Sequence, residues 1–277
     1  MLDDEKIKDF EFGTQINNGY KIIEKIGEGS FGHVYKGINL KTNEFVAVKI
    51  ESDFTKSKVL NNEAKILKHL SKNNYVPNLK WFGKLGNFRY IIIDLLGKSL
   101  LDSRDTFKKN ITLCKYILIT ITEIIESIHK YGLIYRDIKP ENFLYDLNDK
   151  TKVYIIDFGL CKSYLRSDKS HIKQDRNGHY TGTIRYSSIF IHEGYNHSRR
   201  DDLISVAYMI MYLYHGTLPW CGIKEKNFKK RFNYIMNVKK EKLEQGCELD
   251  FIDNYIQSCY KLSFDDKPNY SNLIKNI

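Results

Sequence analysis

Two short segments of the chain carry residue types that suit the handling of a metal ion and a phosphate group. They read Arg136-Asp137-Ile138-Lys139-Pro140-Glu141-Asn142 and Asp157-Phe158-Gly159, with the second aspartate twenty residues after the first. Carboxylate and amide oxygens such as those of Asn142 and Asp157 are the hard ligands that Mg²⁺ prefers. Asp137 could accept a proton from an incoming hydroxyl group, and Lys139 could neutralise phosphate charge. The alternative is a chance cluster of charges in two loops, which this combination of residues and spacing disfavours.

A glycine-rich segment near the N-terminus suits a close approach to phosphate oxygens. It reads Ile26-Gly27-Glu28-Gly29-Ser30-Phe31-Gly32-His33-Val34. Glycines let backbone N–H groups reach a phosphate without a Cβ in the way. On its own, this spacing is first explained by a glycine-rich hairpin. A dinucleotide-binding turn is disfavoured, because a strand-like segment follows rather than a helix.

A lysine and a glutamate extend this pattern. Lys49 ends the apolar segment Val46-Ala47-Val48, and Glu63 follows fourteen residues later inside an amphipathic segment. Taken alone, the two charges could form an ordinary solvated pair. Next to a phosphate-binding loop, the lysine could bind phosphate oxygens while the glutamate fixes its position.

The order of elements predicts an α+β protein with two unequal lobes. Alternating and β-branched residues indicate strands over 20–50 and 75–94, with a helix over 56–70 between them. Long helices follow, of which 112–130 is the clearest because its isoleucines recur at helical spacing. The predicted organisation is an N-terminal extension (1–19), a small β-rich lobe (20–94), a hinge (94–97) and a larger helical lobe (98–277).

Charge and cysteine usage narrow the class of protein. The net charge of +10 fits either a solvated, lysine-rich surface or a basic face for acidic partners. No zinc-finger, RRM or basic-zipper pattern supports a nucleic-acid partner. The five cysteines are scattered without a CxxC pair, which indicates a reducing, intracellular compartment, either cytoplasm or nucleus.

The sequence predicts no membrane association. Its first residues lack the apolar stretch of a signal peptide. Residues 203–223 contain no Asp, Glu, Lys or Arg, but the solid apolar part ends near Leu213, which is too short to cross a bilayer. A buried core helix is expected there instead.

Together, these motifs resemble the set that is typical of protein kinases. Further segments are similar to the casein kinase 1 family of serine/threonine kinases, from about Tyr20 to the C-terminus: Leu95–Leu100, Tyr154–Leu160, Thr181–Tyr186, Ser198–Leu203, Leu218–Trp220 and Phe264–Pro268. The resemblance implies a bilobal kinase fold that uses ATP and Mg²⁺. It also implies a monomer that transfers the γ-phosphoryl group to serine or threonine of protein substrates, favouring acidic or already phosphorylated sites.

The resemblance also assigns roles to individual residues. It implies catalytic roles for Asp137, Lys139, Lys49, Glu63 and Thr183, and magnesium binding by Asn142 and Asp157. It implies ATP binding by Ile26, Gly27, Glu28, Gly29, Ser30, Phe31, Gly32, Val34, Ala47, Lys49, Ile93, Asp94 and Leu96. It implies substrate anion sites at Arg185, Gly222 and Arg231, and at Arg136 and Lys162. The alternative for Arg231 is that it is one more solvated cation in a lysine-rich segment.

Several expectations concern how the catalytic loop (135–142) and the end of the substrate loop (180–188) are supported. Asp202 is expected to hold the backbone of this loop, and Asp201 to be an ordinary helix N-cap. Asp137 is expected to be an exposed acid. Phe190 departs from the family pattern at the end of the substrate loop, which leaves the anchoring of that loop open.

Two other functions are compatible with parts of the sequence. A catalytically weak, kinase-like scaffold would have lost one of the residues that position phosphate or metal, but Lys49, Asp137, Asn142 and Asp157 are all present. A basic nucleic-acid-associated protein is supported by net charge alone.

Overall fold

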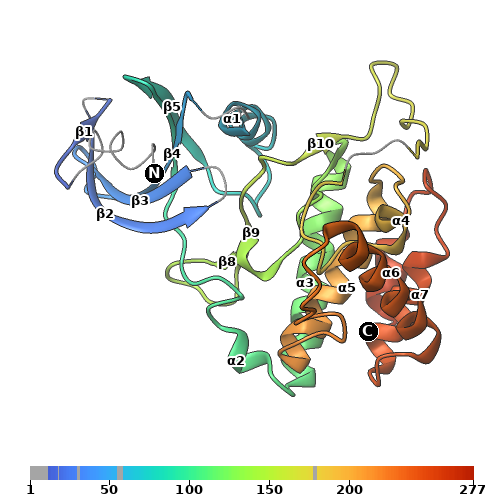
Figure 1. Cartoon of the computed structure of the whole chain (residues 1–277). Coiled ribbons are helices and arrows are strands. Elements are labelled where there is room, and N and C mark those ends of the chain that lie inside the picture. Colours follow the sequence, from blue (N-terminus) through green and yellow to red (C-terminus); the bar gives the residue numbers. More distant parts are fainter. Residues whose placement is uncertain (1–11, 18, 30–31, 55–58, 177–179) are drawn as a thin grey trace. The chain divides into compact units, whose positions relative to one another are not determined.

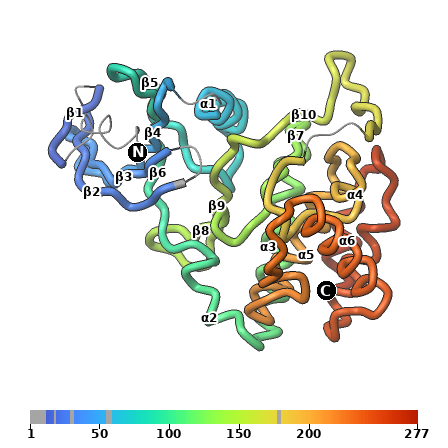
Figure 2. Tube along the Cα trace, viewed as in Figure 1, coloured from blue at the N-terminus to red at the C-terminus, as the bar shows by residue number. Residues whose placement is uncertain are grey.

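The computed structural model describes residues 12–17, 19–29, 32–54, 59–176 and 180–277. The chain divides into two compact units. The first holds the described residues up to Gly97 together with 145–159, and the second holds 98–144 and the described part of 160–277. Figure 1 shows strands dominating the first unit and helices the second, and Figure 2 traces the chain between them. Ser30 and Phe31, two of the residues expected to bind ATP, lie outside the described residues.

The first unit contains a six-stranded antiparallel sheet in the order β1-β2-β3-β4-β6-β5. Its strands are β1 (Gln15–Ile16), β2 (Tyr20–Gly29), β3 (Gly32–Asn39), β4 (Phe45–Ser52), β5 (Leu79–Leu85) and β6 (Phe88–Asp94). The strands predicted over 20–50 are confirmed. The strand region predicted to begin at residue 75 is one hairpin that begins four residues later, at Leu79.

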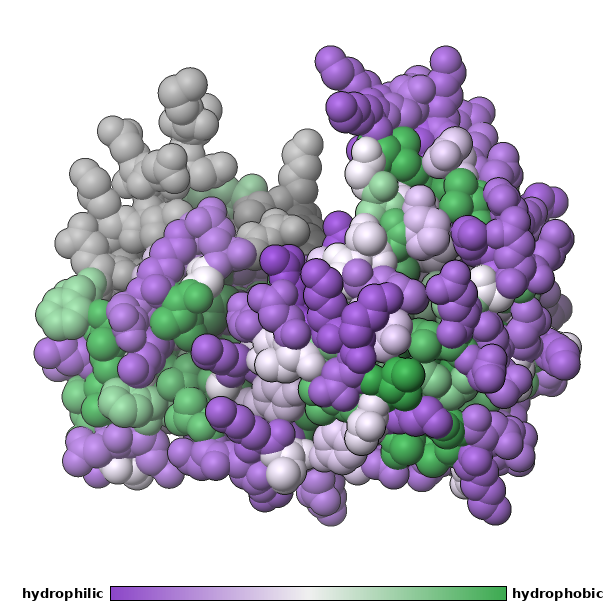
Figure 3. All heavy atoms as spheres, turned by 90° about the horizontal axis from the view of Figure 1, so that it is seen from below, coloured by the Kyte–Doolittle hydropathy of each residue, from purple (hydrophilic) through white to green (hydrophobic). Residues whose placement is uncertain are grey.

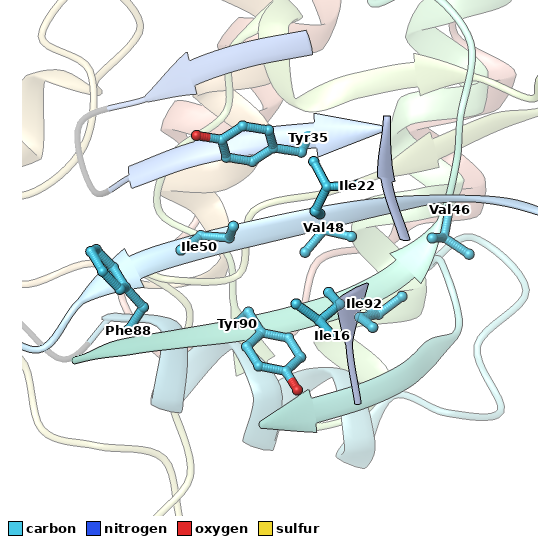
Figure 4. Close-up of a cluster of buried hydrophobic side chains, with 9 residues drawn as sticks. All are labelled: Ile16, Ile22, Tyr35, Val46, Val48, Ile50, Phe88, Tyr90 and Ile92. Atoms are coloured by element: carbon cyan, nitrogen blue, oxygen red, sulfur yellow. The ribbon is translucent and has the colours of Figure 1, made fainter. Parts of the chain in front are cut away.

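Alternation along the strands creates a core on one side of the sheet. Val46, Val48 and Ile50 of β4 join a buried cluster with side chains from β1, β2, β3 and β6 (Figure 4). Burying each such side chain stabilises the fold by about 1.5–3 kcal/mol. Because successive side chains of a strand point to opposite faces, Ala47 and Lys49 lie on the other side of β4.

Helix α1 (Val59–His69) packs one face into the first unit. Leu60, Ala64 and Leu67 are buried at helical spacing, and Glu63 lies on the same face. The carboxylate of Glu51 accepts hydrogen bonds from the N–H groups of Val59 and Leu60, which satisfies two donors at the start of the helix. Strand β9 (Val153–Ile155) joins this unit through a hydrogen bond from the N–H of Ile155 to the carbonyl of Tyr75.

The second unit is mainly helical. Its helices are α2 (Arg104–Phe107), α3 (Ile111–Lys130), the 3-10 helix η2 (Pro140–Asn142), α4 (Ile189–His192), α5 (Arg199–His215), α6 (Phe228–Gln245), α7 (Asp250–Tyr260) and α8 (Tyr270–Lys275). Strands β7 (Leu133–Ile134) and β10 (Lys162–Ser163) pair in this unit, and β8 (Phe143–Tyr145) runs across the boundary between the units along the chain.

Two helices form the core of the second unit. The isoleucines of α3 that the sequence places on one face are buried, at 117, 121, 124, 125 and 128. Helix α5 is buried on nearly every side, which confirms the buried core helix predicted from its apolar sequence. None of the helices in the described part of the chain is both long and apolar enough to cross a membrane.

Candidate active site

Lys49 lies at the centre of a charged triad within the first unit. Its Nζ is 2.6 Å from the carboxylate of Glu63 and 3.0 Å from that of Asp157. Burial alone would lower the pKa of Lys49, but the negative charges of Glu63 and Asp157 outweigh this effect and raise its pKa above the ordinary value. The lysine is therefore a fixed cation, suited to binding phosphate oxygens.

The local chain holds Asp157 in an unusual conformation. Its φ is 60°, in the left-handed region that non-glycine residues rarely adopt. The amide of Asn62, on α1, donates to the carbonyl of Gly159 at 3.1 Å and so ties the end of this turn to the helix. Such strain persists where the surroundings fix it, and it clusters at functional sites.

The pairing of neighbouring strands brings together most of the residues expected to bind ATP. Gly27 of β2 pairs with Val34 of β3, and Val34 pairs in turn with Lys49 of β4. Ala47 pairs with Ile93 of β6. Glu28 pairs with His33, Gly29 with Gly32, Ile26 lies at a bulge of β2, and Asp94 and Leu96 are half-buried at the end of β6 and just beyond it.

Gly32 is required by its surroundings. Its φ is 157°, and a Cβ at this position would lie 1.9 Å from the carbonyl oxygen of Ile50. Any other residue would push β3 away from β4, which carries Lys49. The glycine thus protects the position of the lysine as well as the shape of the loop.

In the second unit, three side chains converge on Asp137. Lys139 Nζ lies 2.5 Å from its carboxylate, Thr183 Oγ1 donates to it at 2.8 Å, and Asn142 Nδ2 donates to it at 3.3 Å. The expectation of an exposed acid is wrong, because Asp137 is only 6% exposed. These donors replace the water that burial removes and keep the carboxylate in one orientation.

Asp202 holds the backbone of the catalytic loop, in agreement with the resemblance. Its carboxylate accepts hydrogen bonds from the N–H groups of Tyr135 at 2.7 Å and Arg136 at 2.8 Å, and it lies 3.0 Å from Nε2 of His129. The expectation that Asp201 is the N-cap of α5 is wrong. Ser198 is the N-cap, and Asp201 lies at the third helical position and accepts from the backbone of Ser198 in a capping box.

A close backbone contact aligns the substrate loop with the catalytic loop. Gly182 has φ 96°, and a Cβ there would lie 2.3 Å from the carbonyl oxygen of Arg136. Arg136 itself has φ 72°. Only glycine allows the two loops to approach this closely, and the approach brings Thr183 within hydrogen-bond distance of Asp137.

The side chains present fit the binding of a divalent metal. Both hydrogen bonds that the side chain of Asn142 makes to other described residues use its Nδ2, which leaves its Oδ1 to act as a ligand. Asp157 supplies a carboxylate in the first unit, whereas Asn142 lies in the second. Each residue has the hard oxygen chemistry of a magnesium ligand.

The three residues of the first expected anion site line one cavity. Arg185, Gly222 and Arg231 surround a space of about 230 Å³, together with Ile184, Trp220, Cys221, Ile223 and Ile235. Burial alone would lower the pKa of Arg185. A hydrogen bond with Tyr186 acts in the opposite direction, and the pKa lies above its ordinary value. Two arginines in the lining of one cavity suit the binding of a phosphate or carboxylate.

The second expected anion site is less developed. Nε of Arg136 donates to the carbonyl of Leu160 at 2.7 Å, and Lys162 lies exposed on β10. Among the described residues, no direct contact joins these two side chains.

Sequence reasoning missed one residue that shapes this region and left the contact of a second one open. Lys239 of α6 is fully buried and bonds the backbone of the substrate loop, although it lies in a lysine-rich segment that gives no signal of burial. Phe190 stacks on Arg200, with the guanidinium carbon 3.5 Å from the ring centre. This contact shows how the end of the substrate loop is anchored. The departure of Phe190 from the family pattern was the only feature of the sequence that pointed to it.

The two groups of residues have complementary chemistry. The first unit offers a fixed cation and a carboxylate beside a glycine-rich hairpin, and the second offers a positioned carboxylate with a lysine and a threonine. These are the parts that phosphoryl transfer requires, since it depends on positioning and charge stabilisation. The family model of the protein kinase domain matches residues 20–275. The chain therefore belongs to the protein kinase family, whose members transfer phosphate from ATP to proteins with the help of a divalent metal.

Proposed function

We propose that the chain is a serine/threonine protein kinase of the casein kinase 1 type that favours acidic or already phosphorylated substrates. The observation that carries this proposal is the cavity that Arg185 and Arg231 both line. A protein kinase gains from such a site only if its substrates carry negative charge. We place the catalytic domain at residues 20–277, after an extension of residues 1–19. We also expect the protein to be a monomer in a reducing, intracellular compartment.

The contacts of these residues support the roles that we propose for them. Asp137 accepts the proton of the substrate hydroxyl, while Thr183 and Lys139 hold its carboxylate in place. Lys49, fixed by Glu63, binds the phosphates of ATP, and Asn142 and Asp157 hold Mg²⁺. When bound, magnesium ATP supplies the phosphoryl group and charge neutralisation. A lysine two residues after Asp137 favours serine and threonine over tyrosine as acceptors.

The test is the transfer of labelled phosphate from ATP to three matched peptides: neutral, acidic and pre-phosphorylated. We expect kcat/KM to be highest for the charged peptides. Arg185→Ala and Arg231→Ala should each lower it about tenfold for the charged peptides and little for the neutral one. Lys230→Ala is the matched control, because Lys230 is an exposed neighbour of Arg231 on the same helix.

Three outcomes contradict the proposal or a part of it. An equal loss for charged and neutral peptides would remove the anion site. If Asp157→Asn, a folded variant without the metal carboxylate, transferred phosphate at the wild-type rate, the metal assignment would be wrong. A wild-type protein that binds ATP but phosphorylates none of the peptides would favour the scaffold alternative.

A further inference from the structure

Helix α6 contains a lysine that is buried without an acidic partner. Lys239 is 0% exposed, and Ile235 is the other residue of this helix that is buried. Among the described residues, no carboxylate lies within ion-pair distance of its Nζ. A buried lysine is costly unless other groups replace its hydration, so its surroundings must compensate.

Backbone carbonyls and aromatic rings provide this compensation. Nζ of Lys239 donates to the carbonyl oxygens of Ile184 at 2.9 Å and Ser187 at 2.7 Å. The rings of Tyr208 and Trp220 lie 5.0 and 5.1 Å from Nζ, within the range of cation–π attraction. Burial lowers the pKa of Lys239 well below its ordinary value. The charged and neutral forms both have enough N–H groups to bond the two carbonyls.

The two carbonyls that Lys239 bonds lie next to the residues of the substrate loop that have proposed roles. Thr183, which bonds Asp137, precedes the first bonded carbonyl, and Arg185, which lines the anion cavity, lies between the two. Nε1 of Trp220 donates to the carbonyl of Arg185 at 2.8 Å, so three carbonyls of residues 184–187 are held from one side.

Aromatic packing from α6 supports the same loop. Tyr180 contacts the rings of Phe228 and Phe232, and its hydroxyl donates to the carbonyl of Gly182 at 2.8 Å. Phe232 also packs on His192, whose Nε2 lies 3.3 Å from Nζ of Lys239. The whole contact therefore runs along one face of α6.

We infer that Lys239 is a positioning residue for phosphate transfer to protein substrates. By fixing the carbonyls of Ile184 and Ser187, it keeps Thr183 in reach of Asp137 and Arg185 at the cavity. A small displacement of groups around a reacting centre costs large factors in rate, so this contact matters for turnover although Lys239 touches no substrate. The inference rests on the kinase activity of the family and is independent of any preference for acidic substrates.

The experiment compares Lys239→Met with Lys240→Met in the full chain. Methionine keeps the length and the packing between the two rings but cannot donate to the carbonyls. Lys240 is the matched control, since it is the next residue on the helix, is exposed and forms an ion pair with Glu193 at 2.7 Å. For a neutral peptide, we expect Lys239→Met to raise KM and to lower kcat/KM by between about tenfold and 100-fold. The KM for ATP should stay within about twofold of the wild type.

Trp220→Phe is the second variant, because it removes only the hydrogen bond to the carbonyl of Arg185 and keeps a ring beside Lys239. It should shift the peptide KM in the same direction by about two- to fivefold. Wild-type kinetics in both variants would overturn the inference. A second outcome would also overturn it: kcat falls in proportion to a loss of ATP-binding sites while the peptide KM is unchanged. A residue that only stabilises the fold predicts that pattern, because the molecules that stay folded bind the peptide normally. A wild-type enzyme without preference for acidic peptides would refute the proposed specificity and leave this comparison intact.

Discussion

Asp202 illustrates how a single buried carboxylate can hold a loop. Burial alone would raise the pKa of Asp202, but hydrogen bonds from His129 and from two backbone N–H groups outweigh it and hold the pKa below its ordinary value. Its contribution to stability is therefore complete above the ordinary pKa of about 4 and is lost as the pH falls further. The adjacent Asp201 differs, because burial raises its pKa to about 6. Contacts, rather than residue type, therefore shift the pKa values of the two neighbours in opposite directions.

A buried histidine gives a testable pH dependence at the same scale. Burial lowers the pKa of His197 to about 4. Between pH 6.5 and about 4, the unfolded chain binds a proton at this residue that the folded chain does not, so stability falls as the pH falls. Between pH 6.5 and pH 5, the free energy of unfolding should therefore fall by about 2 kcal/mol less in His197→Gln than in the wild type. Denaturant titration at the two pH values measures this difference.

The control for this prediction is His69→Gln, because His69 is exposed at the end of α1. Its pH profile is measured beside those of the wild type and of His197→Gln under the same conditions. A profile of His197→Gln that runs parallel to that of the wild type would show that His197 titrates normally in the folded protein.

At the scale of elements, three helices meet at Phe190. This residue of α4 stacks on Arg200 of α5, and its ring centre lies 5.5 Å from that of Tyr260 of α7. The hydroxyl of Tyr260 in turn accepts a hydrogen bond from the N–H of Ile189 at 3.0 Å. Helix α4 directly follows the substrate loop, so these contacts anchor the end of that loop through aromatic rings and a cation.

Phe190→Leu should weaken this anchor. Leucine keeps much of the buried apolar area but cannot stack on the guanidinium group, so we expect the unfolding free energy to fall by about 1–2 kcal/mol. Denaturant unfolding measures this change. Tyr234→Leu, at a side chain that is 54% exposed on α6, should cost much less. Equal losses in both variants would mean that the stack on Arg200 adds nothing.

Local patterns in the sequence predicted many of the elements and much of the site. Alternation identified β4 and thereby the position of Lys49, and fixed spacing identified Asp137 and Asp157. Lys239 could not be predicted, because a lysine next to Lys240 has no local mark of burial, and its partners are 52 and 55 residues away. The burial of Asp137 was missed for a similar reason, since its donor Thr183 lies 46 residues further on.

At the scale of the whole molecule, net charge is the dominant feature. The chain has 44 basic and 34 acidic residues, and Figure 3 shows many hydrophilic side chains on one face, with apolar side chains between them. A positive surface attracts acidic substrates over distances that salt shortens, since the Debye length is about 10 Å at 0.1 M.

This predicts a salt dependence that distinguishes substrates. Raising the ionic strength from about 0.05 M to about 0.5 M should lower kcat/KM for an acidic peptide by about tenfold or more, mainly through KM. The neutral peptide should change by less than about twofold. Steady-state kinetics at several salt concentrations test this, with sodium acetate and sodium chloride compared to exclude a specific anion effect. Parallel curves for the two peptides would contradict it.

The contact at Gly182 limits how such a protein can diverge. Any side chain there would meet the carbonyl of Arg136, so this position cannot vary without separating the loop that selects substrates from the loop that reacts with them. The apolar walls of the anion cavity, such as Ile223 and Ile235, lie outside that contact. Under the proposed function, exchange of these wall residues can therefore change which substrates bind without disturbing the contact at Gly182.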